Sequence, residues 1–201
     1  MATETAETAG KVETAAPWQA LRGVVRERRS NLRIDPQREV PPELVQQLLE
    51  LACWAPNHKH THPWRFAVVT GPGRARLGET AAAGLPALGI TDPGALAKMR
   101  TKYLRAPVVL VVGSAAHPQP HLHRENGYAV AAGVQNLLLG ATALGLASFW
   151  GTGAATDVPG VKELVGLRPE DEIVALIYLG WPVEAAPDGF RAPPVVTHLG
   201  A

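Results

Sequence analysis

The sequence predicts a mixed α and β sandwich in which helices cover a central sheet. Two apolar segments, at 107–113 and 172–180, run without polar alternation, which indicates strands buried on both faces. Residues 125–146 form a long, almost entirely apolar segment of helical length. Because segments with helical spacing alternate with these strands along the chain, a helix-rich shell around the sheet follows.

The elements follow one another with recognisable boundaries. Trp18, Leu21 and Val25 repeat at helical spacing, and Pro41-Pro42 opens a second helix with an apolar face that ends near Ala52. The remaining expected elements are a strand at 65–70, a short helix at 74–83, a strand at 107–113, a helix at 125–146, a strand at 147–150, a helix near 158–166, a strand at 172–180 and an extended C-terminal arm over the last twenty residues.

Composition excludes several classes of protein. The 201 residues carry 19 basic and 18 acidic side chains, and this near-zero balance argues against a nucleic-acid binder. Charged residues make up only 18%, which is low for a soluble monomer. A single cysteine, Cys53, excludes a disulfide framework, and its place on an apolar helix face predicts a core position.

The chain is expected to fold as one domain after a short tail. Residues 1–17 lack large apolar side chains and are expected to be disordered, which leaves 18–201 as the folded domain. The tail has no basic start or apolar run, so it is not a secretory signal. The most apolar stretch, 127–150, contains polar residues and glycines that favour a buried helix over a membrane span. We therefore expect a cytoplasmic protein with no membrane or nucleic-acid partner.

A cluster of arginines is the first candidate site. Six arginines lie between residues 22 and 38 against two acidic residues, and Arg28-Arg29-Ser30 is its densest part. Arginine forks bind phosphate in a bidentate geometry, and a serine hydroxyl can complete the contact. The alternative is a solvated helix end, where arginines complement the helix dipole.

A histidine-rich loop is the second candidate. His58, His60 and His62 alternate, so in an extended loop they would point the same way and could ligate a metal. No cysteine or acidic residue nearby completes such a site, and we expect no metal. The third candidate is the small-residue run 149–153 after a strand, where a ligand could approach the backbone. No glycine-rich Rossmann or P-loop signature occurs.

Taken together, these segments resemble the FMN-dependent nitroreductase family, and most closely its short bacterial NAD(P)H nitroreductase subgroup. The resemblance covers about residues 21–183. It rests on RRS at 28–30, APNHKHTHPWRFAVVTGPGR at 55–74, KYLRAPVVLVV at 102–112, ALGLASFWGTG at 143–153 and EIVALIYLGWP at 172–182. It implies an α+β fold, a three-layer α-β-α sandwich with a mostly antiparallel sheet, and a homodimer with FMN at the subunit interface.

The resemblance also implies site residues. FMN would be bound by residues of three segments: Arg28, Arg29 and Ser30; Trp54 and His58; and Trp150, Gly151 and Thr152. NAD(P)H would contact the segment Gly140, Ala141, Thr142, Ala143, Leu144 and Gly145. The sequence departs from the family pattern at three positions: His62 replaces the usual Gln before Pro-Trp, Trp54 is bulkier than is common, and Gly151 stands where relatives often have Arg.

The implied reaction passes electrons from NAD(P)H through flavin to a nitroaromatic, quinone or similar electron-poor acceptor in a ping-pong sequence. The flavin carries the hydride chemistry, so no catalytic side chain is required. A cation near the N1–O2 edge of the flavin would stabilise its reduced form. Arg28 or Arg29 could do so only if its guanidinium group faces the ring. The rival interpretations are a flavin-storage or sensor protein without turnover and a metal-binding module of the three histidines.

Overall fold

A four-stranded antiparallel sheet forms the centre of the computed structural model, which describes residues 16–186 and 188–200. Within these residues the strand order is β1-β2-β4-β3, and every adjacent pair is antiparallel. The strands are β1 (Trp64–Thr70), β2 (Val108–Ser114), β3 (Ala147–Gly151) and β4 (Glu172–Gly180). All four expected strands are confirmed to within a residue at each end, and the apolar β2 and β4 are the central pair.

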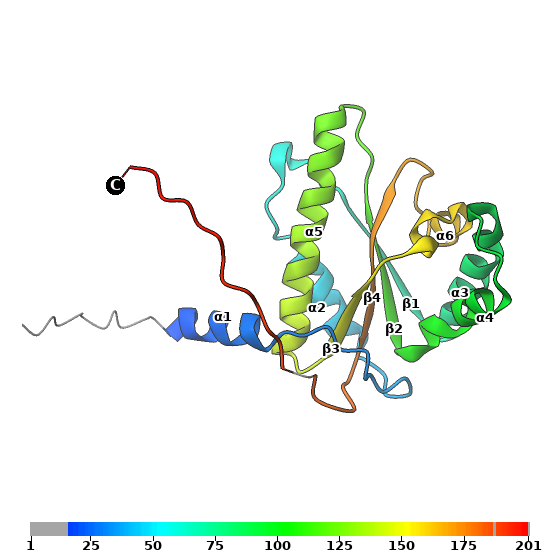
Figure 1. Cartoon of the computed structure of the whole chain (residues 1–201), viewed down its shortest axis with the longest axis horizontal. Helices are drawn as coiled ribbons and strands as arrows, with labels where there is room; N and C mark the ends of the chain where they lie inside the picture. The colour runs from blue at the N-terminus through cyan, green and yellow to red at the C-terminus, as the bar shows by residue number, and fades with distance from the viewer. Residues whose placement is uncertain (1–15, 187, 201) are drawn as a thin grey trace, which may run out of the picture.

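Helices cover both faces of this sheet (Figure 1). On one face, α2 (Pro42–Ala52) and α5 (Pro120–Ala143) enclose a core that includes Leu48 and Val130. On the other face, α3 (Gly73–Gly84), α4 (Pro93–Thr101) and α6 (Pro159–Leu164) enclose a core around Leu77 and Tyr103. Every residue of β2 is buried between the two cores, which confirms the three-layer sandwich.

Short 3-10 helices connect the larger elements: η1 (His58–His60), η2 (Leu85–Leu88), η3 (Lys102–Arg105) and η4 (Ala154–Asp157). Sequence analysis did not predict α4 or η3, because Pro93-Gly94 and scattered lysines weaken the apolar periodicity of this region. The start of α4 is fixed by Asp92, whose carboxylate accepts a hydrogen bond from the Ala95 N–H at 2.7 Å. This unpredicted segment forms one wall of a pocket described below.

The N-terminal helix α1 (Ala16–Glu27) begins inside the expected tail, ahead of the boundary at Trp18. Residues 1–15, the rest of that tail, lie outside the described residues. No residue of α1 is buried, and Trp18 and Leu21 on its apolar face are 51% and 53% exposed. The helix therefore has an apolar face that the rest of the described chain does not cover.

The last residues leave the sandwich as an arm without helix or strand over 183–186 and 188–200 (Figure 1). At its base, Pro182 forms an isolated antiparallel bridge with Ile34. Further along, the side chains of Val195 and Leu199 are almost fully exposed. The irregular arm confirms the expectation for the described part of the C-terminus.

The long helix α5 begins at Pro120 rather than at residue 125, because a proline is favoured in the first turn of a helix. It ends at Ala143, and Gly145 follows with a φ of 74°, a conformation that glycine adopts without strain. Among the described residues, no helix combines the length and the continuous hydropathy that crossing a bilayer requires. The stretch 127–150 is instead a largely buried helix and strand, as predicted.

Candidate functional site

A short segment connects two of the three candidate regions. Residues 28–32 leave α1 and run beside β3, where Ser30 forms a parallel bridge with Ser148. The Asn31 N–H donates a hydrogen bond to the Ser148 carbonyl oxygen at 2.9 Å. This pairing holds Arg28-Arg29-Ser30 against the strand that ends in Trp150 and Gly151, so the arginine cluster and the small-residue run share one site.

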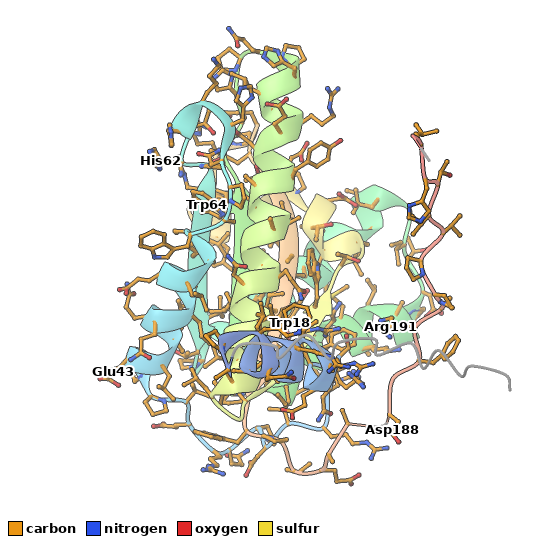
Figure 2. All side chains as sticks on the ribbon, turned by 90° about the vertical axis from the view of Figure 1, so that its left-hand side faces the viewer. Trp18, Glu43, His62, Trp64, Asp188 and Arg191 are labelled. Atoms are coloured by element: carbon orange, nitrogen blue, oxygen red, sulfur yellow. The ribbon has the colours of Figure 1, made fainter. Side chains whose placement is uncertain are left out.

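A pocket of about 570 Å³ lies beside the arginines. Its lining is Val25, Arg26, Arg28, Arg29, Gln135, Gly189, Phe190 and Arg191, without an acidic side chain. Arg191 comes from the C-terminal arm and lies beside the end of α1 (Figure 2). Four guanidinium groups therefore converge from two segments that are far apart in the sequence.

Among the residues that the structure describes, no carboxylate forms an ion pair with these four arginines. Burial, followed by repulsion from Arg191 and Arg29, lowers the pKa of Arg28. Nη1 of Arg29 donates to the Arg28 carbonyl oxygen at 2.8 Å, while its Nε is buried without a hydrogen-bond partner among the described residues. Four arginines around one pocket favour an anion as its ligand.

A second pocket, of about 390 Å³, lies at the other end of the same segment, where Leu32 reaches its wall. Its apolar lining includes Leu85, Met99, Phe149 and Tyr178. Gly151 and Thr152 line it from the end of β3. The volume falls within the range of small-molecule sites, and the predominantly apolar wall suits a flat ring.

Three cations, Lys98, Lys102 and Arg105, line this second pocket. Burial, followed by repulsion from Arg105 and Lys98, lowers the pKa of Lys102. The Lys102 Nζ lies 5.1 Å from the centre of the Tyr103 ring, and among the described residues none of the three cations pairs with a carboxylate. The pocket therefore combines apolar walls with unpaired positive charge.

Tyr178 supplies a neutral hydroxyl in this pocket. Burial raises the pKa of Tyr178 to about 12, and nearby Arg105 opposes this rise. Its ring stacks on Tyr103 with centroids 6.0 Å apart and meets Phe149 edge to face at 6.1 Å. These contacts hold the wall of the pocket rigid, since aromatic pairs favour such arrangements.

Trp54 and His58 lie apart from these two pockets. The α2 helix ends at Ala52, so Cys53 and Trp54 fall in the following turn, and Trp54 is 84% exposed. Cys53 is exposed as well, so the prediction of a core cysteine is wrong: the helical face does not continue to residue 53. His58 pairs with Glu125, with Nδ1 to Oε2 at 2.6 Å.

The distance between the two groups can be followed along α5. Glu125 contacts His58, whereas Gln135 lines the arginine pocket. Ten residues of α-helix rise by about 15 Å. A single chain therefore does not bring His58 to the arginines, and Trp54 is not among the residues that line either pocket.

The histidine loop is a tight turn and does not have the extended form that would point its three histidines the same way. Lys59, His60 and His62 have φ values of 58°, 49° and 48°. Asn57 holds the turn: its Oδ1 accepts from the His62 N–H at 2.9 Å and its Nδ2 donates to Thr61 Oγ1 at 2.9 Å. Among the residues that the structure describes, no three His, Cys, Asp or Glu side chains gather as a metal site would need.

The segment 140–145 is the C-terminal turn of α5 and its cap. Ala141 is fully buried, and a side chain at Gly140 would collide with Leu48 and Leu51 of α2. The Thr142 hydroxyl donates to the Leu138 carbonyl oxygen at 3.0 Å. Helix packing accounts for these small residues, and their assignment to NAD(P)H stays a prediction.

Four cations of the two pockets were missed by sequence analysis: Lys98, Lys102, Arg105 and Arg191. The lysines and Arg105 belong to α4 and η3, which were not predicted. The only sequence signal was the run Lys102–Arg105 directly before a strand. Arg191 lies in an irregular arm, so no periodicity indicates which way it points.

Comparison with known proteins identifies the fold and the family. The chain is similar to the protein named Putative NAD(P)H nitroreductase YdjA of Escherichia coli (strain K12), with 33% identity over 161 residues, covering 78% of this chain and 87% of YdjA. A nitroreductase-like family protein from Bacillus cereus superposes with a TM-score of 0.75 at 28% identity, covering 92% and 95% of the two chains. The FMN-dependent nitroreductase NfnB from Mycobacterium smegmatis, solved in complex with NADPH, has the same fold, with a TM-score of 0.68 at 24% identity and coverage of 90% and 96%. The model of the nitroreductase family matches residues 25–181, and the chain therefore belongs to the nitroreductase family.

Proposed function

We propose that the protein is an FMN-dependent oxidoreductase that passes electrons from NAD(P)H to an electron-poor acceptor such as a nitroaromatic or a quinone. The observation that carries this proposal is the pair of pockets joined by residues 28–32. One pocket is lined by arginines and the other by apolar walls with lysines. FMN has the same two parts, a phosphate and a flat ring that gains negative charge on reduction.

The residues of the two pockets fit FMN. Arg28, Arg29 and Arg191 would bind the phosphate, because guanidinium groups form bidentate, charge-assisted hydrogen bonds with its oxygens. Ser30 lies between the pockets and would contact the ribityl chain. The ring would occupy the second pocket next to Gly151 and Thr152, where glycine lets it approach the backbone closely.

FMN, when bound, would accept a hydride and pass its two electrons to the acceptor. The chain's contribution is position and charge. Lys102, half-buried in the second pocket, would stabilise the negative charge of the reduced ring, a role that Arg28 or Arg29 could fill only with its guanidinium group facing the ring. The apolar walls around Leu85 and Met99 exclude water and strengthen this interaction.

We also propose a homodimer with a flavin site at the interface between two copies. The apolar face of α1 is uncovered, and Tyr128 on α5 is 64% exposed. Exposed apolar surface of this kind marks an interaction site. A second copy packed on these helices could bring Trp54 and His58 to the flavin of its partner, which a single chain does not do.

The names of the relatives support NAD(P)H as the electron donor. YdjA is named as an NAD(P)H nitroreductase and NfnB was solved with NADPH, so we propose NAD(P)H for this chain. The alternating use of donor and acceptor at one flavin would give ping-pong kinetics. The segment 140–145 remains the predicted nicotinamide contact.

Flavin binding is the first test. Purified protein is expected to be yellow, or to become so when FMN is added, with one flavin per chain. Colourless protein that does not bind added FMN would contradict the proposal. Bound flavin that neither NADH nor NADPH reduces would indicate the storage or sensor alternative.

A further inference from the structure

The second pocket carries more positive charge than the flavin ring requires. A reduced flavin ring gains one negative charge, and one neighbouring cation suffices to stabilise it. Three cations line this pocket: Lys98, Lys102 and Arg105. Burial lowers the pKa of Lys102, and repulsion from Arg105 and Lys98 adds to this effect. Three unpaired cations around one pocket favour an anionic group of a ligand in addition to the reduced ring.

The three cations occupy different depths. Lys102 is half-buried, whereas Lys98 and Arg105 are exposed at the mouth of the pocket. Lys102 lies about one helical turn from each of the other two along α4 and η3, so the three cations line one side of the pocket. Among the described residues, neither Lys98 nor Arg105 has an acidic partner that would neutralise it.

The neighbouring Arg100 shows the contrast. It belongs to the same helix α4, but its Nε pairs with Glu79 at 3.2 Å, and it does not line the pocket. Among the described residues, α4 therefore carries one cation that is paired with α3, Arg100, and one unpaired cation that lines the pocket, Lys98. This difference points to a ligand charge at the pocket mouth.

We propose that Lys98 and Arg105 select acceptors that carry a negative group, with aromatic carboxylates as the class that the pocket fits. With the flavin ring next to Gly151 and Thr152, the ring of the acceptor would lie against it and the remaining apolar wall, and Lys98 and Arg105 would contact the carboxylate. The neutral hydroxyl of Tyr178 lines the same pocket and makes no hydrogen bond within the described residues, so it is available as a donor. This inference rests on the proposed function, since it names the substrate class of the same site.

The reaction of such an acceptor balances without a further reagent. When 4-nitrobenzoate becomes 4-nitrosobenzoate, the nitro group gains two electrons and two protons and loses one oxygen as water. NAD(P)H supplies the two electrons and one proton as a hydride equivalent, and solvent supplies the second proton. The carboxylate takes no part in this step, so its effect measures binding alone.

The experiment compares 4-nitrobenzoate with its neutral methyl ester on the holoprotein. Each cation about 5 Å from the carboxylate in water contributes a factor of about four, so KM for the acid is expected to be at least about fourfold below KM for the ester. The advantage should shrink at high ionic strength, because salt screens exposed charges. Calorimetric titration of benzoate into the oxidised holoprotein gives the same comparison without turnover.

Variants identify the residues responsible. Lys98→Gln and Arg105→Gln should each reduce the ratio of ester KM to acid KM about fourfold and weaken benzoate binding to the same extent. Arg100→Gln is the matched control, since it removes the same charge from α4 outside the pocket and should leave the ratio unchanged. Flavin content and thermal melting confirm that each variant is folded.

Two results would overturn the inference. The first is an acid and an ester with equal KM values, and the second is a ratio that falls equally in the Arg100→Gln control. Both leave the proposed function intact, provided that NAD(P)H still reduces the bound flavin. A protein that binds no FMN would instead contradict the proposed function, whatever its affinity for benzoate.

Discussion

Ser30 and Ser148 form a parallel bridge that ties the segment after α1 to the edge strand β3. The adjacent Asn31 N–H bonds to the Ser148 carbonyl oxygen, and the Ser148 hydroxyl is buried without a partner among the described residues. This contact holds the segment 28–32 in place, with the arginine pocket at its start and the second pocket at its end. The proposed FMN site depends on it.

Removing the arginines should weaken FMN binding. Arg28→Ala and Arg29→Ala should each cost about 1–3 kcal/mol of FMN affinity, because charge-assisted hydrogen bonds to phosphate have that strength. Arg191→Ala should act in the same direction. The measurement is the FMN dissociation constant by fluorescence titration, with riboflavin, which lacks the phosphate, as the comparison.

The riboflavin comparison separates the two interpretations of the cluster. If the arginines bind phosphate, riboflavin affinity should be the same in the variants and in the parent protein. Unchanged FMN affinity in both Arg28→Ala and Arg29→Ala would support the alternative interpretation, in which the arginines belong to a solvated helix end and bind no phosphate.

Lys102→Gln should lower the reduction potential of the bound flavin. Loss of a cation beside the ring destabilises the reduced, negatively charged form by about 1.4 kcal/mol, which corresponds to a fall of about 30 mV for a two-electron couple. Lys162→Gln is the control. Lys162 lies on α6, donates a hydrogen bond to the Pro169 carbonyl oxygen and does not line the second pocket. A potential that is equal in both variants would exclude Lys102 as the stabilising cation.

The uncovered face of α1 should be a dimer interface. Light scattering at micromolar concentration should give the mass of two chains, and Trp18→Glu combined with Leu21→Glu should shift the protein toward monomer, since the charges would be buried at the contact. The monomeric form should also lose flavin if the partner's residues complete the site. A parent protein that is monomeric at this concentration would contradict the dimer.

Asp171 should stabilise the fold in a pH-dependent way. Burial alone would raise its pKa, but hydrogen bonds from Arg168 and from the Ala116 and Arg168 N–H groups outweigh burial and hold the pKa below its usual value. A carboxylate with a depressed pKa contributes stability above its unfolded pKa and loses it as pH falls through the folded pKa. Asp171→Asn should therefore cost about 1–3 kcal/mol at neutral pH, with the difference in Tm from the parent shrinking below about pH 4. A Tm difference that is constant from pH 7 to pH 3 would show that ionisation of Asp171 is irrelevant.

The sheet was predictable from sequence because its strands are apolar without interruption. The run 172–180 matches β4 at both ends, and 107–113 differs from β2 by one residue at each end. The region 85–106 was not predictable, since α4 is stabilised by a side-chain cap and by packing on α3 rather than by its own periodicity. The same region supplies the pocket lysines.

The site was predictable only in part, for a physical reason. Arg28, Ser30 and Gly151 were predicted because their residue types suit phosphate and close approach, and the bridge between Ser30 and Ser148 brings their two segments side by side. Arg191 and Lys102 were not found, since their role depends on tertiary contacts that leave no local pattern. The low charge of the chain has a similar origin: much of 127–150 is buried between the sheet and α2 within one subunit.

Anaerobic reduction of the FMN-loaded protein tests the central claim most directly. Addition of NADPH or NADH without oxygen should bleach the flavin bands, and a nitroaromatic or quinone added afterwards should restore them with one acceptor reduced per flavin by two electrons. Flavin that stays oxidised with both nicotinamides, or that is reduced but not reoxidised by any acceptor of these classes, would contradict the assignment as an oxidoreductase.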